Sequence, residues 1–331
     1  MNQQVELRFD HLARQARTHT NLSALRREGD GLWVAGDETA TVEYLTWNGE
    51  RYDHQRSFRL ADYVDLPAGP DEEADIEGLA RSGGYLWLVG SHSLKRKRVK
   101  SPDPNKARRR LSTVLREENR FILVRLPLDP ATNAPARTVD GRTAAILSGP
   151  GRNVADLVAE DPHLAPFLAL PGKDNGFDLE GIAMVGDRIF LGLRGPVLRG
   201  WAVVLEITTE TDPRDPHRLR VAAPYQTNFL DLDGLGVRDL CPDGEDLLLL
   251  AGPTMHLDGP VRVVRWRAPG SRSVVPAVEL EPVTDLPFGA GCDHPEGLAV
   301  LEDGRLMVVY DSPGPHRLTP EGGVYADVIT I

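Results

Sequence analysis

Several features that would reveal a function directly are missing from this 331-residue chain. Its two cysteines, Cys241 and Cys292, fit no metal-ligand spacing, and we expect small buried side chains and not a disulfide. No segment is apolar for long enough to span a membrane, and the first ten residues lack the basic start and apolar centre of a signal peptide. Nucleophile motifs, phosphate-binding glycine loops and zinc spacings are also missing. We therefore expect a cytoplasmic protein without a familiar catalytic signature.

Positive charge is scarce as well. The chain has 38 Lys and Arg against 49 Asp and Glu, which gives a formal net charge of −11. Such an excess of negative charge disfavours general binding to nucleic acid and is typical of a soluble protein that has no affinity for membranes. As partners we expect a small anionic molecule or another protein, and we expect the chain to be a monomer.

What the sequence does contain is one pattern that returns five times. The clearest copy runs from Asp75 to Gly90, where a short apolar run, a polar turn and a second apolar run follow one another. Such a pattern predicts two buried antiparallel strands joined by a tight turn. The other copies are 21–37, 178–195, 236–252 and 294–312.

The spacing of the copies predicts an all-β fold, a single closed β-propeller over residues 1–331. The copies recur with a period of about 55 residues, and one interval is about twice as long. A period of this length is typical of four-stranded blades. A third strand-like run follows each copy, at 41–47, 120–128, 201–208, 261–267 and 323–331. The alternating residues 5–9 have no hairpin of their own, and we expect them to complete the last blade as its outer strand. Five blades of four antiparallel strands fit best, and six are the alternative.

Two insertions account for the double interval. Residues 95–119 form a strongly basic stretch, for which we expect an exposed loop that is solvated or covers an anionic ligand with its Lys and Arg side chains. Residues 150–175 carry apolar residues at helical spacing interrupted by prolines, which predicts a short helical insertion on the rim.

The candidate site lies where equivalent positions of the blades converge at one mouth of the channel. Aligning the turns gives Glu77, Glu180 and Glu296 the same position as Ser23 and Arg238. Facing carboxylates repel one another and need a cation, so the three glutamates are candidate ligands of Ca²⁺ or Mg²⁺. Arg238 could neutralise them without a metal. A purely structural role, in which each glutamate accepts backbone N–H bonds from the next blade, remains an alternative.

A second ring of polar residues follows the second strand of each copy. His92 and Arg194 are candidate catalytic residues because they could move a proton or bind an anion. The candidate ligand-binding residues are Ser91, Arg238, His256 and Asp311. A structural, hydrogen-bonded role is the alternative for each histidine.

The repeated strand starts DIEGLA, DLEGIA and HPEGLA, with the loops GSHSLKRKR, GLRGP and LAGP, resemble an uncharacterised bacterial propeller family known as domain of unknown function 3616. The resemblance covers essentially the whole chain and implies a propeller without an established activity. More distantly, the strand starts are similar to those of phytase-like and gluconolactonase-like propellers. That similarity implies metal binding by glutamates at the channel mouth, here Glu77, Glu180 and Glu296.

Two hypotheses about function follow. One is a metal-assisted hydrolase of a phosphate ester or lactone, with the glutamates holding the ion and His92 or Arg194 contacting the substrate. The other is a non-catalytic propeller that binds an anionic ligand or a partner protein.

Overall fold

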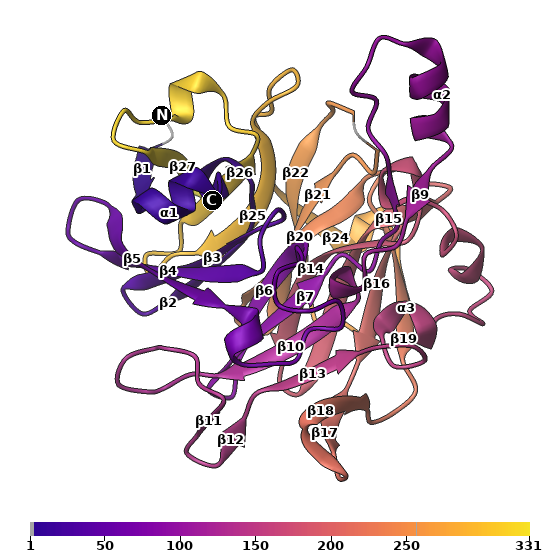
Figure 1. The fold of residues 1–331 in the computed structure, drawn as a ribbon, viewed down its shortest axis with the longest axis horizontal. Coiled ribbons are helices and arrows are strands. Elements are labelled where there is room, and N and C mark those ends of the chain that lie inside the picture. The colour runs from indigo at the N-terminus through magenta and orange to yellow at the C-terminus, as the bar shows by residue number, and fades with distance from the viewer. Residues whose placement is uncertain (1–2, 256) are drawn as a thin grey trace.

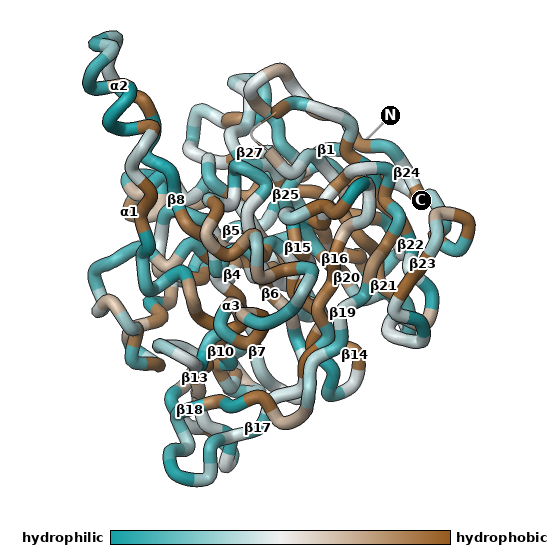
Figure 2. The backbone as a smooth tube through the Cα atoms, turned by 90° about the vertical axis from the view of Figure 1, so that its right-hand side faces the viewer, coloured by the Kyte–Doolittle hydropathy of each residue, from teal (hydrophilic) through white to brown (hydrophobic). Residues whose placement is uncertain are grey.

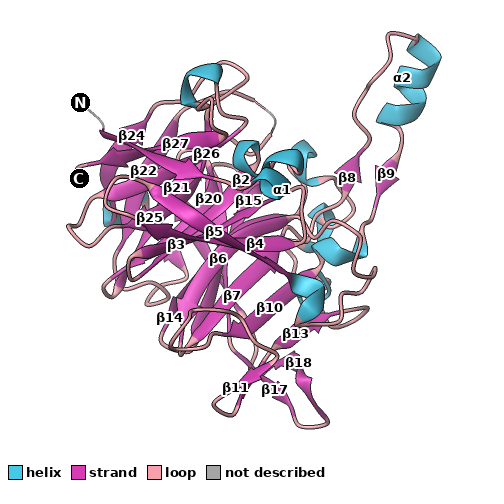
Figure 3. Ribbon diagram, turned by 60° about the vertical axis from the view of Figure 1, so that its left-hand side comes forward, coloured by secondary structure: helices cyan, strands magenta, loops and turns pink. Residues whose placement is uncertain are grey.

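The structure, a computed structural model, describes residues 3–255 and 257–331 and is built almost entirely of β-strands (Figures 1 and 3). Within these residues the main strands fall into five antiparallel sets of four. The first set is β2 (Leu22–Glu28), β3 (Gly31–Gly36), β4 (Thr41–Trp47) and β5 (Tyr52–Arg59). The second set is β6 (Ile76–Ser82), β7 (Tyr85–Gly90), β10 (Ile122–Pro127) and β13 (Ala145–Ser148). The third set is β14 (Asp178–Val185), β15 (Arg188–Leu198), β16 (Trp201–Ile207) and β19 (Gln226–Asp231).

The last two sets complete the arrangement. The fourth set is β20 (Gly236–Asp243), β21 (Asp246–Gly252), β22 (Val261–Trp266) and β24 (Leu280–Leu286). The fifth set is β25 (His294–Val300), β26 (Leu306–Asp311), β27 (Gly323–Ile329) and the N-terminal β1 (Gln3–Arg8). Strand β1 pairs antiparallel with β27 from Gln3 opposite Val328 to Arg8 opposite Gly323, which confirms the predicted outer place of the N-terminal strand. The predicted third strands are confirmed as β4, β10, β16, β22 and β27.

Smaller elements decorate these sets. The short strands are β8 (Lys95–Arg96), β9 (Val114–Leu115), β11 (Thr138–Val139), β12 (Arg142–Thr143), β17 (Thr209–Asp212), β18 (Asp215–Val221) and β23 (Val274–Val275). The α-helices are α1 (His11–Gln15), α2 (Pro104–Leu111) and α3 (Val154–Leu157). The 3₁₀ turns are Thr18–Thr20, Leu60–Asp62, Glu118–Arg120, Ala165–Phe167, Gly172–Asp174, Ala277–Glu279 and Pro315–Arg317. No helix in the described residues is long and apolar enough to cross a membrane.

The first strands of the five sets lie side by side in a ring. Strand β2 contacts β6, β6 contacts β14, β14 contacts β20, β20 contacts β25, and β25 contacts β2. Between each pair of neighbouring sets in the described chain lies one hydrophobic cluster. In Figure 2 the apolar segments accordingly concentrate on the strands inside the molecule.

Burial on both faces explains the continuous apolar runs in the sequence. In β21, Leu247 and Leu249 pack in the cluster shared with the third set, whereas Leu248 and Leu250 pack in the cluster shared with the fifth set. Side chains alternate along a strand, so a strand covered on both faces needs apolar residues at every position. Trp33, Trp87 and Phe190 are buried in these clusters.

Glycines after the repeated glutamates let neighbouring first strands approach closely. A Cβ on Gly181 in β14 would lie 2.9 Å from the backbone N of Leu240 and 3.0 Å from the Cα of Asp239 in β20. We expect Gly181→Ala to lower the free energy of unfolding by about 1–3 kcal/mol, because the backbone of β20 must move. Urea unfolding measures the change. Gly252→Ala is the control, since the atoms nearest to its Cβ would belong to side chains and not to a backbone, the first being Arg238 Cγ at 3.2 Å, and we expect a smaller loss.

Candidate functional site

The five positions aligned from the sequence are structurally equivalent. Each is the extra residue at a shift in register between the first and second strands of its set. These residues are Ser23, Glu77, Glu180, Arg238 and Glu296. A β-bulge of this kind turns one side chain out of the regular alternation. The bulges therefore explain how the polar side chains point away from the hydrophobic clusters and toward the centre of the ring.

Two of the three glutamates are paired with arginines. Arg194 Nη1 lies 2.6 Å from one oxygen of Glu180, and Arg238 Nε lies 2.8 Å from the other. Arg238 also donates a hydrogen bond to Glu296. All four side chains are buried. Arg238 therefore neutralises part of the predicted metal set, as the alternative from the sequence anticipates, and Glu77 is left without an ion pair among the described residues.

The structural role considered for the glutamates, acceptance of backbone N–H bonds from the next set of strands, belongs to another residue. Within the described residues, the side chains of Glu77, Glu180 and Glu296 accept no hydrogen bond from a backbone N–H group. Asp239, which follows Arg238 in β20, accepts such a bond from Leu298 in β25 at 2.8 Å. Asp239 stands directly after Arg238, at the position where a glycine follows each of the three glutamates.

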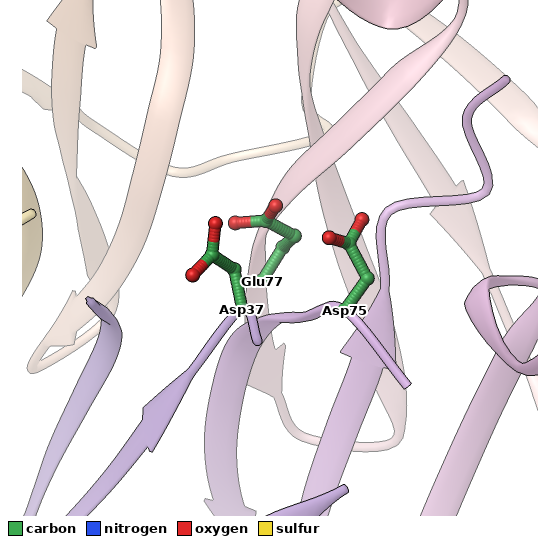
Figure 4. Close-up of side chains that lie close together, drawn as sticks. All are labelled: Asp37, Asp75 and Glu77. Carbon is green, nitrogen blue, oxygen red and sulfur yellow. The ribbon is translucent and has the colours of Figure 1, made fainter. Parts of the chain in front are cut away.

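Besides its cluster with Glu180 and Glu296, Glu77 belongs to a second acidic cluster with Asp37 and Asp75 (Figure 4). One carboxylate oxygen from each of the three residues lies within 4.8 Å of the others. Asp75 precedes β6 with a φ of 50°, a left-handed conformation that is uncommon outside glycine, and Arg120 Nε donates to its carboxylate at 2.8 Å. Asp37 follows β3 and is partly buried, and one of its oxygens is buried without a hydrogen bond in the described structure.

Burial and mutual repulsion raise the pKa of several of these carboxyl groups. Burial, with Asp75 and Asp311 nearby, raises the pKa of Asp37 to about 7. Burial and then the charges of Asp75 and Glu180 raise the pKa of Glu77 well above its usual value. Burial and the charge of Glu180 raise the pKa of Asp178 to about 7. A proton or a metal cation would relieve this excess of negative charge.

A cavity of about 280 Å³ opens at this end of the ring. Its lining includes Arg194, Arg238, Glu296, Asp37 and Asp311, together with the ring of His294, whose pKa a hydrogen bond with Asp311 raises. Three further cations in its lining form no ion pair within the described residues: Arg17, Arg98 and Lys173. Arg98 belongs to the basic insertion and Lys173 to the second insertion, so both inserted segments reach the cavity.

The predicted site residues separate into two groups. Arg194, Arg238 and Asp311 line the cavity, but Ser91 and His92 are not among its lining residues. The His92 ring packs edge-on against Phe121, with ring centroids 5.7 Å apart, and burial together with nearby Arg116 lowers its pKa to about 4. Its backbone N–H bonds to the Arg120 carbonyl at 3.0 Å, which turns the chain into the core. His256 lies outside the described residues.

An arginine closes the centre of the ring deeper along β2. Arg26 Nη2 lies 2.7 Å from Asp239, and the guanidinium group also donates to backbone carbonyls of four first strands. These carbonyls belong to Leu25, Ile182, Leu240 and Leu298. Both charged side chains are almost fully buried. A buried ion pair therefore links the first strands of several sets at this point. Arg26 is not predicted from the sequence, because one arginine in a strand carries no distinguishing signal.

Comparison with solved structures finds similar folds at low identity. The glutaminyl cyclase of Myxococcus xanthus has 9% identity over 99% of this chain and 95% of its own, with a TM-score of 0.44. The aldose sugar dehydrogenase of Streptomyces coelicolor, solved with PQQ, has 11% identity over 99% and 98%, with a TM-score of 0.40. The β-propeller domain of Cps50 (Swd1) from Myceliophthora thermophila has 11% identity over 99% and 100%, with a TM-score of 0.36. At this level of likeness no activity carries over to this chain.

Sequence comparison gives a firmer result for the family than for any single relative. No curated protein matches the chain. One family model matches it over residues 21–327, which is nearly its whole length and includes all five of the repeated strand pairs. The chain therefore belongs to the family described as "Protein of unknown function (DUF3616)".

Proposed function

We propose that the five sets are the blades of one closed propeller and that its channel mouth binds a small anionic ligand together with a divalent cation. The observation that carries this proposal is that unpaired cations and one member of an acidic cluster line the same cavity. Arg17, Arg98 and Lys173, which form no ion pair in the described chain, line it together with Asp37, which belongs to the cluster with Asp75 and Glu77. An anion in the cavity would meet these donors, and a cation held by the cluster would bridge it to the carboxylates.

The acidic cluster of Asp37, Asp75 and Glu77 is the better candidate for the cation than the set predicted from the sequence. Its oxygens come from two neighbouring blades and suit a hard cation such as Ca²⁺ or Mg²⁺. Arginines already face both oxygens of Glu180 and one of Glu296, so these residues would support Glu77 and not bind the ion directly. Arg120 contacts only one oxygen of Asp75, which leaves the other for the ion. The high pKa of Asp37 and Glu77 is the expected property of carboxylates that lack their counter-ion.

Hydrolysis of a phosphate ester or lactone is the reaction class that such a site would serve. The bound cation would polarise the oxygen of the scissile group. With the cation bound, Asp37 would be one of its ligands and would not transfer a proton. His92, proposed from the sequence for this task, is buried away from the cavity lining. Arg194 would hold Glu180 in place, because its guanidinium is already bonded to Glu180 and to the Thr254 carbonyl.

A non-catalytic binding propeller is the second candidate, and one observation favours it. The guanidinium groups of Arg194 and Arg238 are both engaged with glutamates and with backbone carbonyls of the loop after β21. Arginines held in this way shape a pocket but offer few free donors to a transition state.

Thermal unfolding of the chelator-treated protein tests the cation site. We expect one of Ca²⁺, Mg²⁺ or Mn²⁺ to stabilise the folded state by about 2.7 kcal/mol at a hundredfold excess over its Kd. Glu77→Gln should abolish this stabilisation because it removes a ligand without changing the shape of the side chain. The control is Glu245→Gln, the same change at an exposed turn, which should leave it intact.

The outcomes separate the two candidate functions. Stabilisation by a cation, followed by hydrolysis of phosphate esters or lactones that is lost in Glu77→Gln, supports the hydrolase. Stabilisation without turnover supports the binding propeller. If no ion changes the melting temperature of the wild type, the cation site is refuted and the glutamates are left as partners of the arginines.

A further inference from the structure

The basic insertion forms a projecting arm. Residues 95–119, which we call the arm, leave the second set after β7 and return before β10 as the β8–β9 ladder carrying helix α2. All three views show α2 standing away from the rest of the chain (Figures 1, 2 and 3). Its base is fixed to the body by Arg96, 2.7 Å from Asp174, and by Lys95, 3.4 Å from Glu73.

None of the eight residues of helix α2 is buried. Arg96 donates to its Leu111 carbonyl, and Arg110 donates to the Arg98 carbonyl, and both contacts lie within the arm. Its start is specified locally: Asp103 accepts a hydrogen bond from the backbone N–H of Lys106 at 2.9 Å, and Pro104 occupies the first turn. An isolated helix this short is marginal in water without packing. The arm therefore lacks the contacts that usually hold such a helix, and a partner would supply them.

The arm also concentrates charge that nothing in the described structure neutralises. Seven of its cations form no ion pair within those residues: Lys97, Arg98, Lys100, Lys106, Arg108, Arg109 and Arg110. This is unusual in a chain with 49 acidic residues. Three aliphatic side chains lie exposed among them, Val99, Leu111 and Val114. Like charges held together repel one another, so the arrangement is favourable only against an acidic partner.

The composition of the arm indicates a protein as that partner. Residues 95–119 contain no aromatic side chain, so they lack the stacking groups used for single-stranded nucleic acid and the anchors used at membrane interfaces. Exposed aliphatic residues surrounded by charge are typical of protein interfaces, where an apolar centre is enclosed by a polar rim. The expected partner surface is acidic, with exposed apolar side chains.

The chain itself offers exposed apolar side chains at the same end of the molecule. Met255, Leu257 and Phe288 line the cavity and are 44%, 61% and 44% exposed, and we call them the apolar rim. The carboxylates closest to the rim in sequence are already engaged: Asp258 accepts from the backbone N–H of Gly291 at 3.0 Å, and Asp285 lies 3.6 Å from Arg262. The arm carries ten Lys or Arg and three acidic residues, whereas the whole chain has a net charge of −11, so arm and body have opposite charge.

We propose that a second copy of this chain docks face to face over the cavity mouth, with each arm on the apolar rim of the other copy. Arm and rim belong to one end of the molecule, since Arg98 and the rim line the same cavity. A two-fold axis can therefore satisfy both contacts at once, as a self-complementary interface requires. The dimer differs from the monomer that the net charge predicts, because overall charge does not show that the basic residues are gathered on one arm. It does not depend on the proposed ligand.

Sedimentation of the full chain at micromolar concentrations tests the dimer. We expect dimers in about 50 mM salt and weaker association in about 500 mM salt, because screening reduces the attraction between arm and body. The variant Lys106→Glu, Arg108→Glu, Arg109→Glu should weaken dimerisation at least tenfold. Its melting temperature should not fall, since these side chains are exposed and outside the core.

Two further variants make the result specific. Arg137→Glu, Arg152→Glu, Arg214→Glu makes the same change of charge at exposed positions outside the arm and should leave the dimer intact. Leu257→Ser, Phe288→Ser removes apolar contact from the rim and should weaken the dimer even though the arm is unchanged. A wild type that remains monomeric in low salt overturns the proposal, and so does a dimer that persists in the arm variant.

Discussion

Replacing Arg26 with alanine should lower the free energy of unfolding by about 3–5 kcal/mol, because it leaves a buried carboxylate without its cation. The Asp239 side chain is 1% exposed, and Arg26 Nη2 lies 2.7 Å from it. Burial alone raises the pKa of Asp239, and Arg26 opposes this shift. The same substitution also removes donors from carbonyl groups of four first strands. Few substitutions in the chain remove so many buried contacts at once.

The neighbouring arginine supplies the control. Arg27 follows Arg26 in β2, but its side chain turns to the opposite face and pairs at 3.4 Å with the highly exposed Glu302. Exposed pairs of this kind contribute about 0–1 kcal/mol, so Arg27→Ala should cost little. Urea unfolding measures both variants. Equal losses for Arg26→Ala and Arg27→Ala would show that the buried contacts of Arg26 do not stabilise the fold.

A second substitution separates the ion pair from the backbone contacts. In Arg26→Ala with Asp239→Asn, no charge is left buried at this point, while the amide oxygen introduced at position 239 can still accept from the Leu298 backbone N–H. We expect the double variant to be less destabilised than the sum of the two single variants, since residues in direct contact are energetically coupled. If the losses of unfolding free energy in the two single variants add strictly, the loss in Arg26→Ala comes from its contacts with the carbonyl groups and not from the ion pair.

The sequence predicts the strand arrangement well, because each set of four strands is stabilised by a pattern that it contains locally. Strands covered on both faces require runs such as Leu247–Leu250, and the turns between them require Gly or Asp, so the hairpins can be read directly. Aligning these hairpins gives Glu77, Glu180 and Arg238 equivalent positions, which the register shifts in β6, β14 and β20 confirm.

The partners of these residues are harder to predict, since they come from other strand sets and from loops. Nothing near Glu180 in the sequence shows that Arg238, fifty-eight residues later, will approach its carboxylate. Asp37 could have been found, because it directly follows the second strand of its repeat just as Ser91 does. Helix α2 was predicted as loop, although Asp103 and Pro104 form a recognisable helix start.

Protonation of Asp37 and Asp178 should make the stability of the cation-free protein depend on pH in a specific direction. The pKa of Asp37 and of Asp178 is about 7 in the folded state, against about 3.8 in the unfolded chain. Between these values the folded state binds protons that the unfolded state has lost, so its stability falls as pH rises from about 4 to about 7. A shift of about three units corresponds to at most about 4 kcal/mol for each group.

The variant Asp37→Asn, Asp178→Asn should isolate this effect from other titrating groups. His92, whose pKa is lowered to about 4, stabilises the folded state as pH rises from about 4 to its unfolded value and so opposes the carboxylates. Because the variant keeps His92, the difference in unfolding free energy between variant and wild type should grow in favour of the variant by several kcal/mol between pH 4 and pH 8. A difference that does not change with pH would show that these carboxyl groups titrate normally.

A divalent cation should remove this dependence of stability on pH in the wild type. The ion would take the place of the protons on the cluster, so its stabilising effect should be small near pH 4 and largest above pH 7. Melting curves at both pH values, with and without the ion, measure this change. Asp37→Asn alone should lose the stabilisation by metal at high pH, because it removes both a titrating group and a proposed ligand. If the ion stabilised the wild type equally at both pH values, it would be bound elsewhere, and the raised pKa of Asp37 would be unrelated to metal binding.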